Sequence, residues 1–203
     1  MSHRIYTTEG FVLSRTEKGE ASKILHLFTE KFGLVSVYAQ GVCEIRSKLR
    51  IPLSSSPLLS FSLVRGKSMW RLTDVHEIGP YSYNEIPHEV SLLFAKISIL
   101  LKRLCEEDST VSELFHYIRE GFQFLCRESF TPRELSAVEI ILVLNILSFL
   151  GYMPRAEKPI PLQSLIVKVA KGHGWNKDIL EEAGRFNREL VIIINETLAA
   201  THL

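Results

Sequence analysis

The feature that most constrains the fold is a series of short β-like stretches in the first 80 residues. Three of them lie within residues 8–42, and two more lie around residues 59–63 and 70–72. The turn residues that separate the stretches are 18–20, 30–33 and 65–68. In residues 35–40, apolar Val and Ala alternate with Ser, Tyr and Gln, which is the period-2 pattern of a half-buried strand. The segment is therefore predicted to form a five-stranded sheet.

The longest connection lies between the third and fourth predicted strands. Five strands with this spacing are typical of a small closed barrel, and the OB-fold is the natural candidate. The connection carries Arg46, Lys48 and Arg50 at alternate positions, so an extended backbone would project all three cations to one side. A barrel could also bring Lys67 and Arg71, which flank the next hairpin, close to this connection.

The charge of the chain is unevenly divided. The formal net charge is +1, but residues 1–80 hold 11 Lys and Arg against 7 Asp and Glu, a net charge of +4. Between Glu44 and Asp74 there are six basic residues and no acidic one. A field of this kind suits an anionic polymer, although a solvated basic loop has the same composition. Tyr38 and Trp70 are the aromatic candidates for stacking on bases, and burial in the barrel is the alternative for both.

Residues 81–203 are predicted to be helical and have a net charge of −3, from 13 basic and 16 acidic residues. The predicted helices are about 88–105, one that follows a capping box at Thr110 and Glu113, 131–150, a short one near 162–171, and about 177–198. The third has the clearest boundaries, since Thr131 and Glu134 form a capping box and Gly151 supplies a left-handed cap. It is apolar nearly all round, so we expect it at the centre of the helical part.

The sequence shows no recognisable catalytic or metal chemistry. Gly66-Lys67-Ser68 resembles the end of a phosphate-binding loop, but Phe61 stands where that motif requires glycine. No C-x-x-C or H-E-x-x-H spacing occurs and the seven histidines are isolated, so we expect no cofactor, no structural zinc and no enzyme activity.

The sequence also indicates a cytoplasmic protein without a membrane anchor. The first residues lack the apolar region of a signal peptide, and the three cysteines are scattered. The longest apolar run, residues 140–150, is shorter than the roughly 20 residues that span a bilayer.

An ordered set of short motifs resembles a known family. The motifs are Gly10-Phe11-Val12-Leu13, Gly19-Glu20, Leu27-Phe28-Thr29-Glu30, Ala39-Gln40-Gly41, Ser47-Lys48-Leu49-Arg50, Leu63-Val64-Arg65-Gly66 and Leu72-Thr73-Asp74. In this order they resemble the N-terminal domain of RecO, a family of DNA-binding and strand-annealing proteins of bacterial recombinational repair. The likeness covers about the first 78 residues and has a weaker landmark at residues 147–154. Many relatives bind zinc through cysteines that follow this landmark, whereas this chain has Arg155-Ala156-Glu157-Lys158-Pro159.

The resemblance and the residue pattern together give an α+β protein of two domains. Residues 1–80 are expected to form an OB-fold nucleic-acid-binding barrel, and residues 81–203 an α-helical domain. The resemblance implies sequence-independent binding of single- and double-stranded DNA, strand annealing without ATP, and help in recombinase loading. It also implies a RecR-type protein, the single-stranded-DNA-binding protein and, indirectly, a RecA-type recombinase as partners in a bacterial cytoplasm. The alternatives are a protein-interaction adaptor and an RNA-binding OB protein.

The candidate residues fall into two groups. The predicted DNA-binding residues are Arg46, Lys48, Arg50, Lys67, Arg71 and Tyr38. The helical part is expected to dock the acidic and apolar tail of the single-stranded-DNA-binding protein, with basic residues at the rim of an apolar pocket. The candidates for that rim are Lys102, Arg103 and Arg127, and the alternative is that these three only solvate helix ends.

Overall fold

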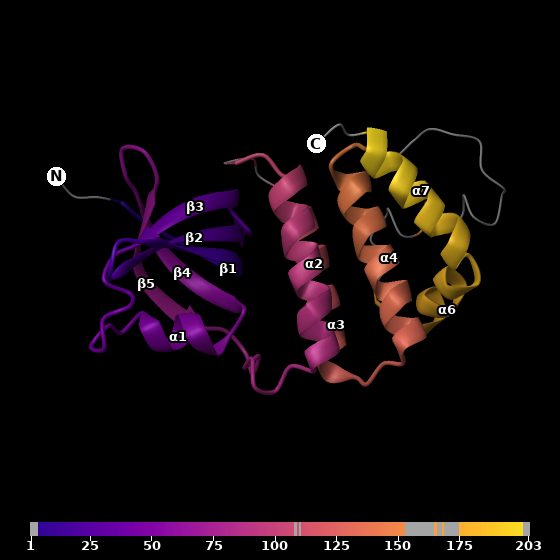
Figure 1. Cartoon of the computed structure of the whole chain (residues 1–203), viewed down its shortest axis with the longest axis horizontal. Helices are drawn as coiled ribbons and strands as arrows, with labels where there is room; N and C mark the ends of the chain where they lie inside the picture. Colours follow the sequence, from indigo (N-terminus) through magenta and orange to yellow (C-terminus); the bar gives the residue numbers. More distant parts are fainter. Residues whose placement is uncertain are drawn as a thin grey trace.

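A computed structural model describes residues 4–107, 109, 111–152, 165, 168 and 175–200. The strands are β1 (Ile5–Lys18), β2 (Ser22–Thr29), β3 (Gly33–Ala39), β4 (Leu58–Arg65) and β5 (Trp70–Glu77). They form a closed barrel in the order β1-β2-β3-β5-β4, at the left of Figure 1. The predicted five-stranded barrel is therefore confirmed.

The barrel closes through a short parallel pairing between β3 and β5. Val37 pairs with Trp70 and Tyr38 pairs with Arg71, while the other neighbouring strands are antiparallel. The alternation along β3 places Val37 inside the barrel, fully buried, and Tyr38 outside. Trp70 is only 5% exposed and packs on Phe32 and Tyr6, so it belongs to the interior and is not available for stacking on bases.

The connection between β3 and β4 contains the helix α1 (Arg50–Ser55). The extended backbone predicted for residues 46–50 is wrong, because these residues form turns. The turns are stabilised by backbone hydrogen bonds from the Ser47 N–H to the Glu44 carbonyl (3.0 Å) and from the Arg50 N–H to the Ser47 carbonyl (3.3 Å). Apolar side chains hold this connection against the barrel, because Val42 and Leu53 are buried in the barrel core.

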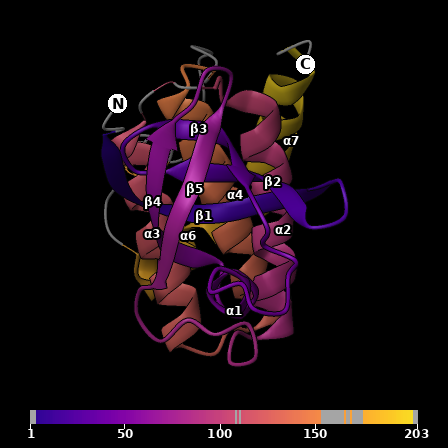
Figure 2. The same ribbon diagram turned by 90° about the vertical axis from the view of Figure 1, so that its left-hand side faces the viewer.

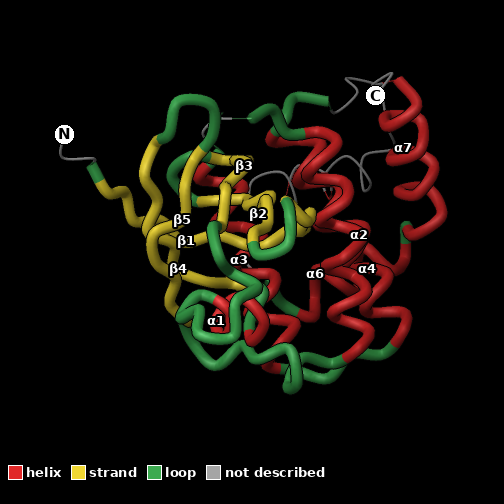
Figure 3. Tube along the Cα trace, turned by 60° about the vertical axis from the view of Figure 1, so that its left-hand side comes forward, coloured by secondary structure: helices red, strands yellow, loops and turns green. Residues whose placement is uncertain are grey.

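The helices form successive layers beside the barrel (Figures 1 and 3). The first layer is made of α2 (His88–Leu104) and α3 (Ser112–Arg127), and α4 (Pro132–Phe149) follows. Nine residues of α4 are buried, which confirms its predicted central place. No helix in the described ranges is both long and apolar enough to cross a membrane.

The ends of α4 match the sequence signals. The Thr131 hydroxyl accepts a hydrogen bond from the Glu134 N–H, and the Glu134 carboxylate accepts one from the Thr131 N–H, so the capping box is complete. At the other end Gly151 has a φ of 79°, and the Tyr152 N–H donates to the Leu147 carbonyl at 2.8 Å. This is the left-handed C-terminal cap expected from the glycine.

Two helix predictions need correction. Val111, not Thr110, occupies the N-cap position of α3 and provides no side-chain cap; Thr110 itself lies outside the described residues. The last predicted helix is divided into α6 (Lys177–Arg185) and α7 (Asn187–Ala200), which meet at Phe186. The apolar stripe runs through both helices, so periodicity alone predicted one. Gly184 weakens the helix near this break, and Arg133 of α4 lies within 3.5 Å of its carbonyl oxygen.

Most of the short helix predicted near 162–171, and the segment that replaces the family's zinc ligands, lie outside the described residues. Within residues 162–171, Leu165 and Lys168 are described, and both are helical.

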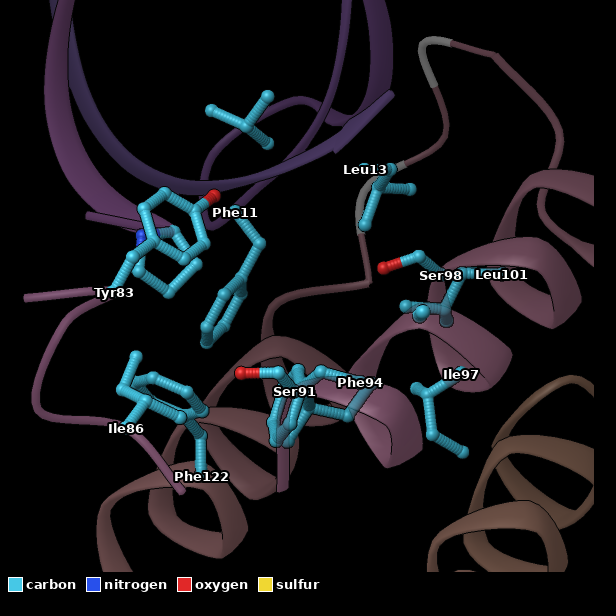
Figure 4. Close-up of a pocket in the computed structure, with 14 residues that line it drawn as sticks. Phe11, Leu13, Tyr83, Ile86, Ser91, Phe94, Ile97, Ser98, Leu101 and Phe122 are labelled. Carbon is cyan, nitrogen blue, oxygen red and sulfur yellow. The ribbon is translucent and has the colours of Figure 1, made fainter. Parts of the chain in front are cut away.

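The barrel interior has its own apolar core, and the core of the helices extends onto the outer face of the barrel. Phe11, Phe28 and two barrel leucines turn away from the barrel interior and join the core of the helices. Phe122 of α3 contacts Phe11, with ring centroids 5.5 Å apart, and Phe94 of α2 at 4.5 Å. A cavity of about 190 Å³ remains at this joint, between β1 and α2, with Tyr83 beside it (Figure 4).

Candidate nucleic-acid interface

Three of the six predicted DNA-binding residues meet at the hairpin that joins β4 and β5. Tyr38, Lys67 and Arg71 line one open hollow of about 650 Å³ on the barrel surface, together with Arg65. We call this the hairpin hollow. In OB-folds, the face of the second and third strands and the loop between the fourth and fifth bind oligonucleotides. The hairpin hollow lies where that loop meets β3.

The shape of the hairpin depends on a close backbone contact. The Gly66 N–H donates to the Met69 carbonyl at 3.1 Å, and a Cβ at position 66 would lie only 2.5 Å from that carbonyl oxygen. Glycine is therefore required for this tight turn. The turn exposes Lys67, while Arg71 stands on the outer face of β5.

Tyr38 is held across the sheet with its ring half-buried. It lies on the outer face of β3, directly opposite Ile24 of β2 and Arg71 of β5. Its hydroxyl donates to the Ser22 hydroxyl at 3.1 Å, which fixes the ring at one edge of the hollow. A fixed ring beside two cations offers a stacking face next to phosphate-binding groups.

Arg65 was missed by the sequence analysis, although it stands in the same turn as Lys67. Its guanidinium lies 5.3 Å from the centre of the Trp70 ring, and its side chain is exposed. The sequence feature that could have identified Arg65 is its position at the end of a predicted strand, two residues before Lys67. Trp70 thus contributes indirectly, as a buried platform beneath a cation of the hollow.

A second hollow lies beside α1 and contains Arg50, Arg15 and Lys23. We call it the rim hollow; its volume is about 380 Å³, and its apolar wall includes Leu25 and Leu53 of the barrel core. The Arg15 guanidinium donates to the Leu53 carbonyl and so ties β1 to α1. Three cations here face one concave surface, which suits a phosphate group.

The remaining two predicted residues, Arg46 and Lys48, are exposed on the turns that precede α1. The connection between β3 and β4 was expected to lie close to the β4–β5 hairpin. This expectation is wrong for the part of the connection that forms α1. Helix α1 and the β4–β5 hairpin tip lie at opposite ends of the barrel, bottom and top in Figure 2. The reason is that α1 ends just before β4 starts, and the eight residues of β4 span about 26 Å.

The three candidate partner-binding residues do not meet. The Lys102 ammonium donates to the Ser14 hydroxyl at 2.8 Å and so bridges α2 to β1, and Arg103 follows it at the exposed end of α2. Arg127 is at the far end of α3, in a shallow hollow with Trp175 and Glu128. Because α3 returns along α2, these residues stand at opposite ends of the layer and cannot rim one pocket.

A polar cluster near Lys102 has the residue types of a catalytic triad but a different arrangement. The Ser36 hydroxyl donates to the Glu107 carboxylate at 2.5 Å and lies 3.2 Å from His26 Nδ1. In a nucleophilic triad the histidine stands between the serine and the acid, and here the serine does. Among the described residues, no group of three or more His, Cys, Asp or Glu side chains is placed to hold a metal ion.

This cluster gives a prediction for pH. Burial, and then the nearby Lys102 charge, lower the pKa of His26, while Glu107 opposes them. Lys102→Gln is expected to raise that pKa and Glu107→Gln to lower it further, which NMR titration of the ring would measure. Because the folded chain binds this proton less readily than the unfolded chain, acidification below about pH 6.5 should cost stability, and less so in Lys102→Gln. Identical His26 titration in all three proteins would contradict this account of the cluster.

Comparison with known proteins agrees with the barrel geometry. Residues 1–81 match the family described as "Recombination protein O N terminal". Residues 1–81 therefore resemble the N-terminal domain of RecO proteins. The match ends just beyond β5, so it coincides with the closed OB-type barrel that the structure shows.

Similarity to RecO proteins extends into the helical part. The chain is 26% identical over 181 residues to the "DNA repair protein RecO" of Christiangramia forsetii, an alignment that covers 86% of this chain and 73% of that protein. It is 27% identical over 149 residues to the protein of the same name from Alkaliphilus metalliredigens, an alignment that covers 72% of this chain and 58% of that protein. It is 30% identical over 157 residues to the protein of the same name from Heliobacterium modesticaldum, an alignment that covers 74% of this chain and 53% of that protein. The resemblance to the RecO family is confirmed, and the chain spans between half and three quarters of these relatives.

Proposed function

We propose that this chain acts in DNA repair as a RecO-type mediator that binds DNA through its barrel without reading sequence. The observation that carries this proposal is the hairpin hollow, where Tyr38, Lys67 and Arg71 meet on the face that OB-folds use for oligonucleotides. The cations can neutralise phosphates, and the ring can stack on any base. The likeness to proteins named DNA repair protein RecO supplies the biological setting.

The same surface accounts for strand annealing. Two complementary strands repel one another through their phosphates, and a basic surface that binds both lowers this repulsion. Annealing of this kind needs no nucleotide hydrolysis. We further propose that residues 1–80 are the DNA-binding domain and that residues 81–203 support it.

The partner proteins implied by the resemblance are a RecR-type protein, the single-stranded-DNA-binding protein and, indirectly, a RecA-type recombinase. Because Lys102 and Arg103 lie apart from Arg127, we propose two distinct contact points for partners on the helices in place of one basic-rimmed pocket.

The salt dependence of binding tests the proposal. With about four to six phosphate contacts, the logarithm of the association constant for single-stranded DNA should fall with the logarithm of salt concentration with a slope of roughly −3 to −4. Fluorescence anisotropy with a labelled oligonucleotide at several salt concentrations measures it, with an RNA of the same sequence in parallel. Absence of binding at low salt would favour the adaptor alternative, and a clear preference for RNA would favour the RNA-binding one.

A further inference from the structure

The turns before α1 and α1 itself expose two large apolar side chains. Ile45 is 90% exposed and Ile51 is 74% exposed, the highest values among the large apolar side chains that the structure describes. Single exposed apolar residues are common on protein surfaces. These two differ because they flank a basic run, Arg46, Lys48 and Arg50, in one short segment.

The segment is fixed to the barrel on one side. Val42 (5% exposed) and Leu53 (4% exposed) are anchored in the barrel core, and Leu49 packs against it. The turn from Glu44 to Arg50 is closed by backbone hydrogen bonds. The inward side of the segment is therefore occupied, and the two isoleucines are presented outward by an ordered backbone.

The surroundings indicate what kind of partner meets them. Arg50, next to Ile51, lines the rim hollow with Arg15 and Lys23, and Arg46 follows Ile45, so each isoleucine has a cation beside it in the sequence. Glu44 is the one acidic neighbour in the segment. A partner must then offer anionic groups and apolar faces a few ångströms apart. Single-stranded nucleic acid does so, because each phosphate is followed by a base with two apolar faces.

A lipid surface fits less well. Binding to a bilayer interface normally uses a helix with a wide apolar face. Helix α1 has six residues, and its Leu53 is turned into the barrel. Its outward side then offers little more than Ile51 for insertion.

We propose that Ile45 and Ile51 pack against bases of the bound strand and insert between neighbouring bases, while the adjacent cations hold its phosphates. Apolar side chains, isoleucine included, act in this way as wedges in other DNA-binding proteins. The inference rests on the proposed DNA binding and adds a role that charge alone does not supply. Wedged bases are unstacked, which leaves their pairing edges accessible to a complementary strand.

The test uses the full chain with Ile45→Ser and Ile51→Ser combined. The variant should bind a single-stranded oligonucleotide about 5- to 10-fold more weakly, the effect of removing two partly buried aliphatic contacts. The slope with salt should not change, because no phosphate contact is lost. The fluorescence increase of a 2-aminopurine base on binding, which reports unstacking, should be reduced. Ile99→Ser, at a 70% exposed isoleucine of α2, is the matched control and should bind as the wild type does.

An abasic strand with the same number of phosphates identifies the contact. The wild type and the double variant should bind it equally, because there is no base to contact. Equal weakening on both strands, or no weakening on the normal strand, overturns the inference while the DNA-binding proposal stands. A wild type that binds neither strand refutes both. Isoleucine-dependent binding to phosphatidylglycerol vesicles, with unchanged oligonucleotide affinity, would assign the segment to a lipid surface and also overturn the inference.

Discussion

Replacing Phe122 by alanine is expected to lower the free energy of unfolding by about 3–5 kcal/mol, the usual cost of removing a buried phenylalanine. Phe122 is 1% exposed and contacts Phe11 of the barrel, Phe94 of α2 and Tyr81 of the connection between the barrel and the helices. The site adjoins the existing 190 Å³ cavity, so truncation enlarges a space that packing already leaves open.

The same substitution tests whether the barrel and the helices fold as one unit. Trp70 lies inside the barrel, and Trp175 packs on Tyr117 of α3, so each tryptophan reports on one part. In single-tryptophan versions, Trp175→Phe and Trp70→Phe, denaturant unfolding should give coincident transitions, because four barrel residues are part of the core of the helices. Phe122→Ala should shift both transitions to lower denaturant together.

The control is Phe124→Ala, a phenylalanine of the same helix that packs on Phe130 and Trp175 and is only half-buried. Phe124→Ala should therefore lower the free energy of unfolding by less than Phe122→Ala does. If Phe122→Ala does not fold, Phe122→Leu, with an expected cost of about 1–2 kcal/mol, carries the same comparison. A Trp70 transition that stays in place while the Trp175 transition moves would show that the two parts are independently stable.

Local signals in the sequence predicted most of the fold because the corresponding interactions are local. The barrel strands followed from period-2 alternation, and both ends of α4 followed from Thr131, Glu134 and Gly151, whose capping partners lie within four residues. The break at Phe186 was not predictable in this way. The apolar stripe continues through it, and a contact with Arg133, more than 50 residues away, adjoins the end of α6.

The candidate site was predictable by residue type but not by position. Tyr38, Lys67 and Arg71 meet because β3 pairs with β5, a long-range register that no local pattern reveals. The turns at residues 44–50 depend on Val42 and Leu53 being buried in the barrel, so alternation of cations along the sequence did not mean an extended strand. Charge patterning located the basic region, and tertiary pairing divided it between two ends of the barrel.

Because the basic residues are divided between two ends of the barrel, removing the cations of either end should have a large effect on DNA binding. Lys67→Ala with Arg71→Ala removes two of the cations that line the hairpin hollow with Tyr38. The triple change Arg46→Ala, Lys48→Ala, Arg50→Ala removes the cations of the turns and α1. Each lost phosphate contact should flatten the salt slope on single strands by roughly 0.7, so the pair should lose about 1.4 and the triple about 2. Annealing rates should fall with affinity. Stability should hardly change, because exposed charges contribute little.

Strand length should separate the two ends. OB-folds bind roughly 4–16 nucleotides. Once it is bound in the hairpin hollow, an oligonucleotide of about 4 nucleotides has too little chain left to reach α1, which lies about 26 Å away along β4. With such a strand the hairpin pair should lose most binding and the triple variant almost none. With about 16 nucleotides both should lose affinity, because the strand can then follow the barrel from end to end.

The matched control removes three positive charges from the helices, as Lys102→Ala, Arg103→Ala and Arg127→Ala. It changes the net charge as much as the triple barrel variant does. Equal losses of DNA affinity in the two variants would show that overall charge causes the effect, and would contradict the assignment of a site on the barrel. If the triple barrel variant binds and anneals long strands like the wild type, the basic turns are a solvated surface. Binding would then be confined to the hairpin hollow, which is lined by the Tyr38 ring and by the two cations of the pair.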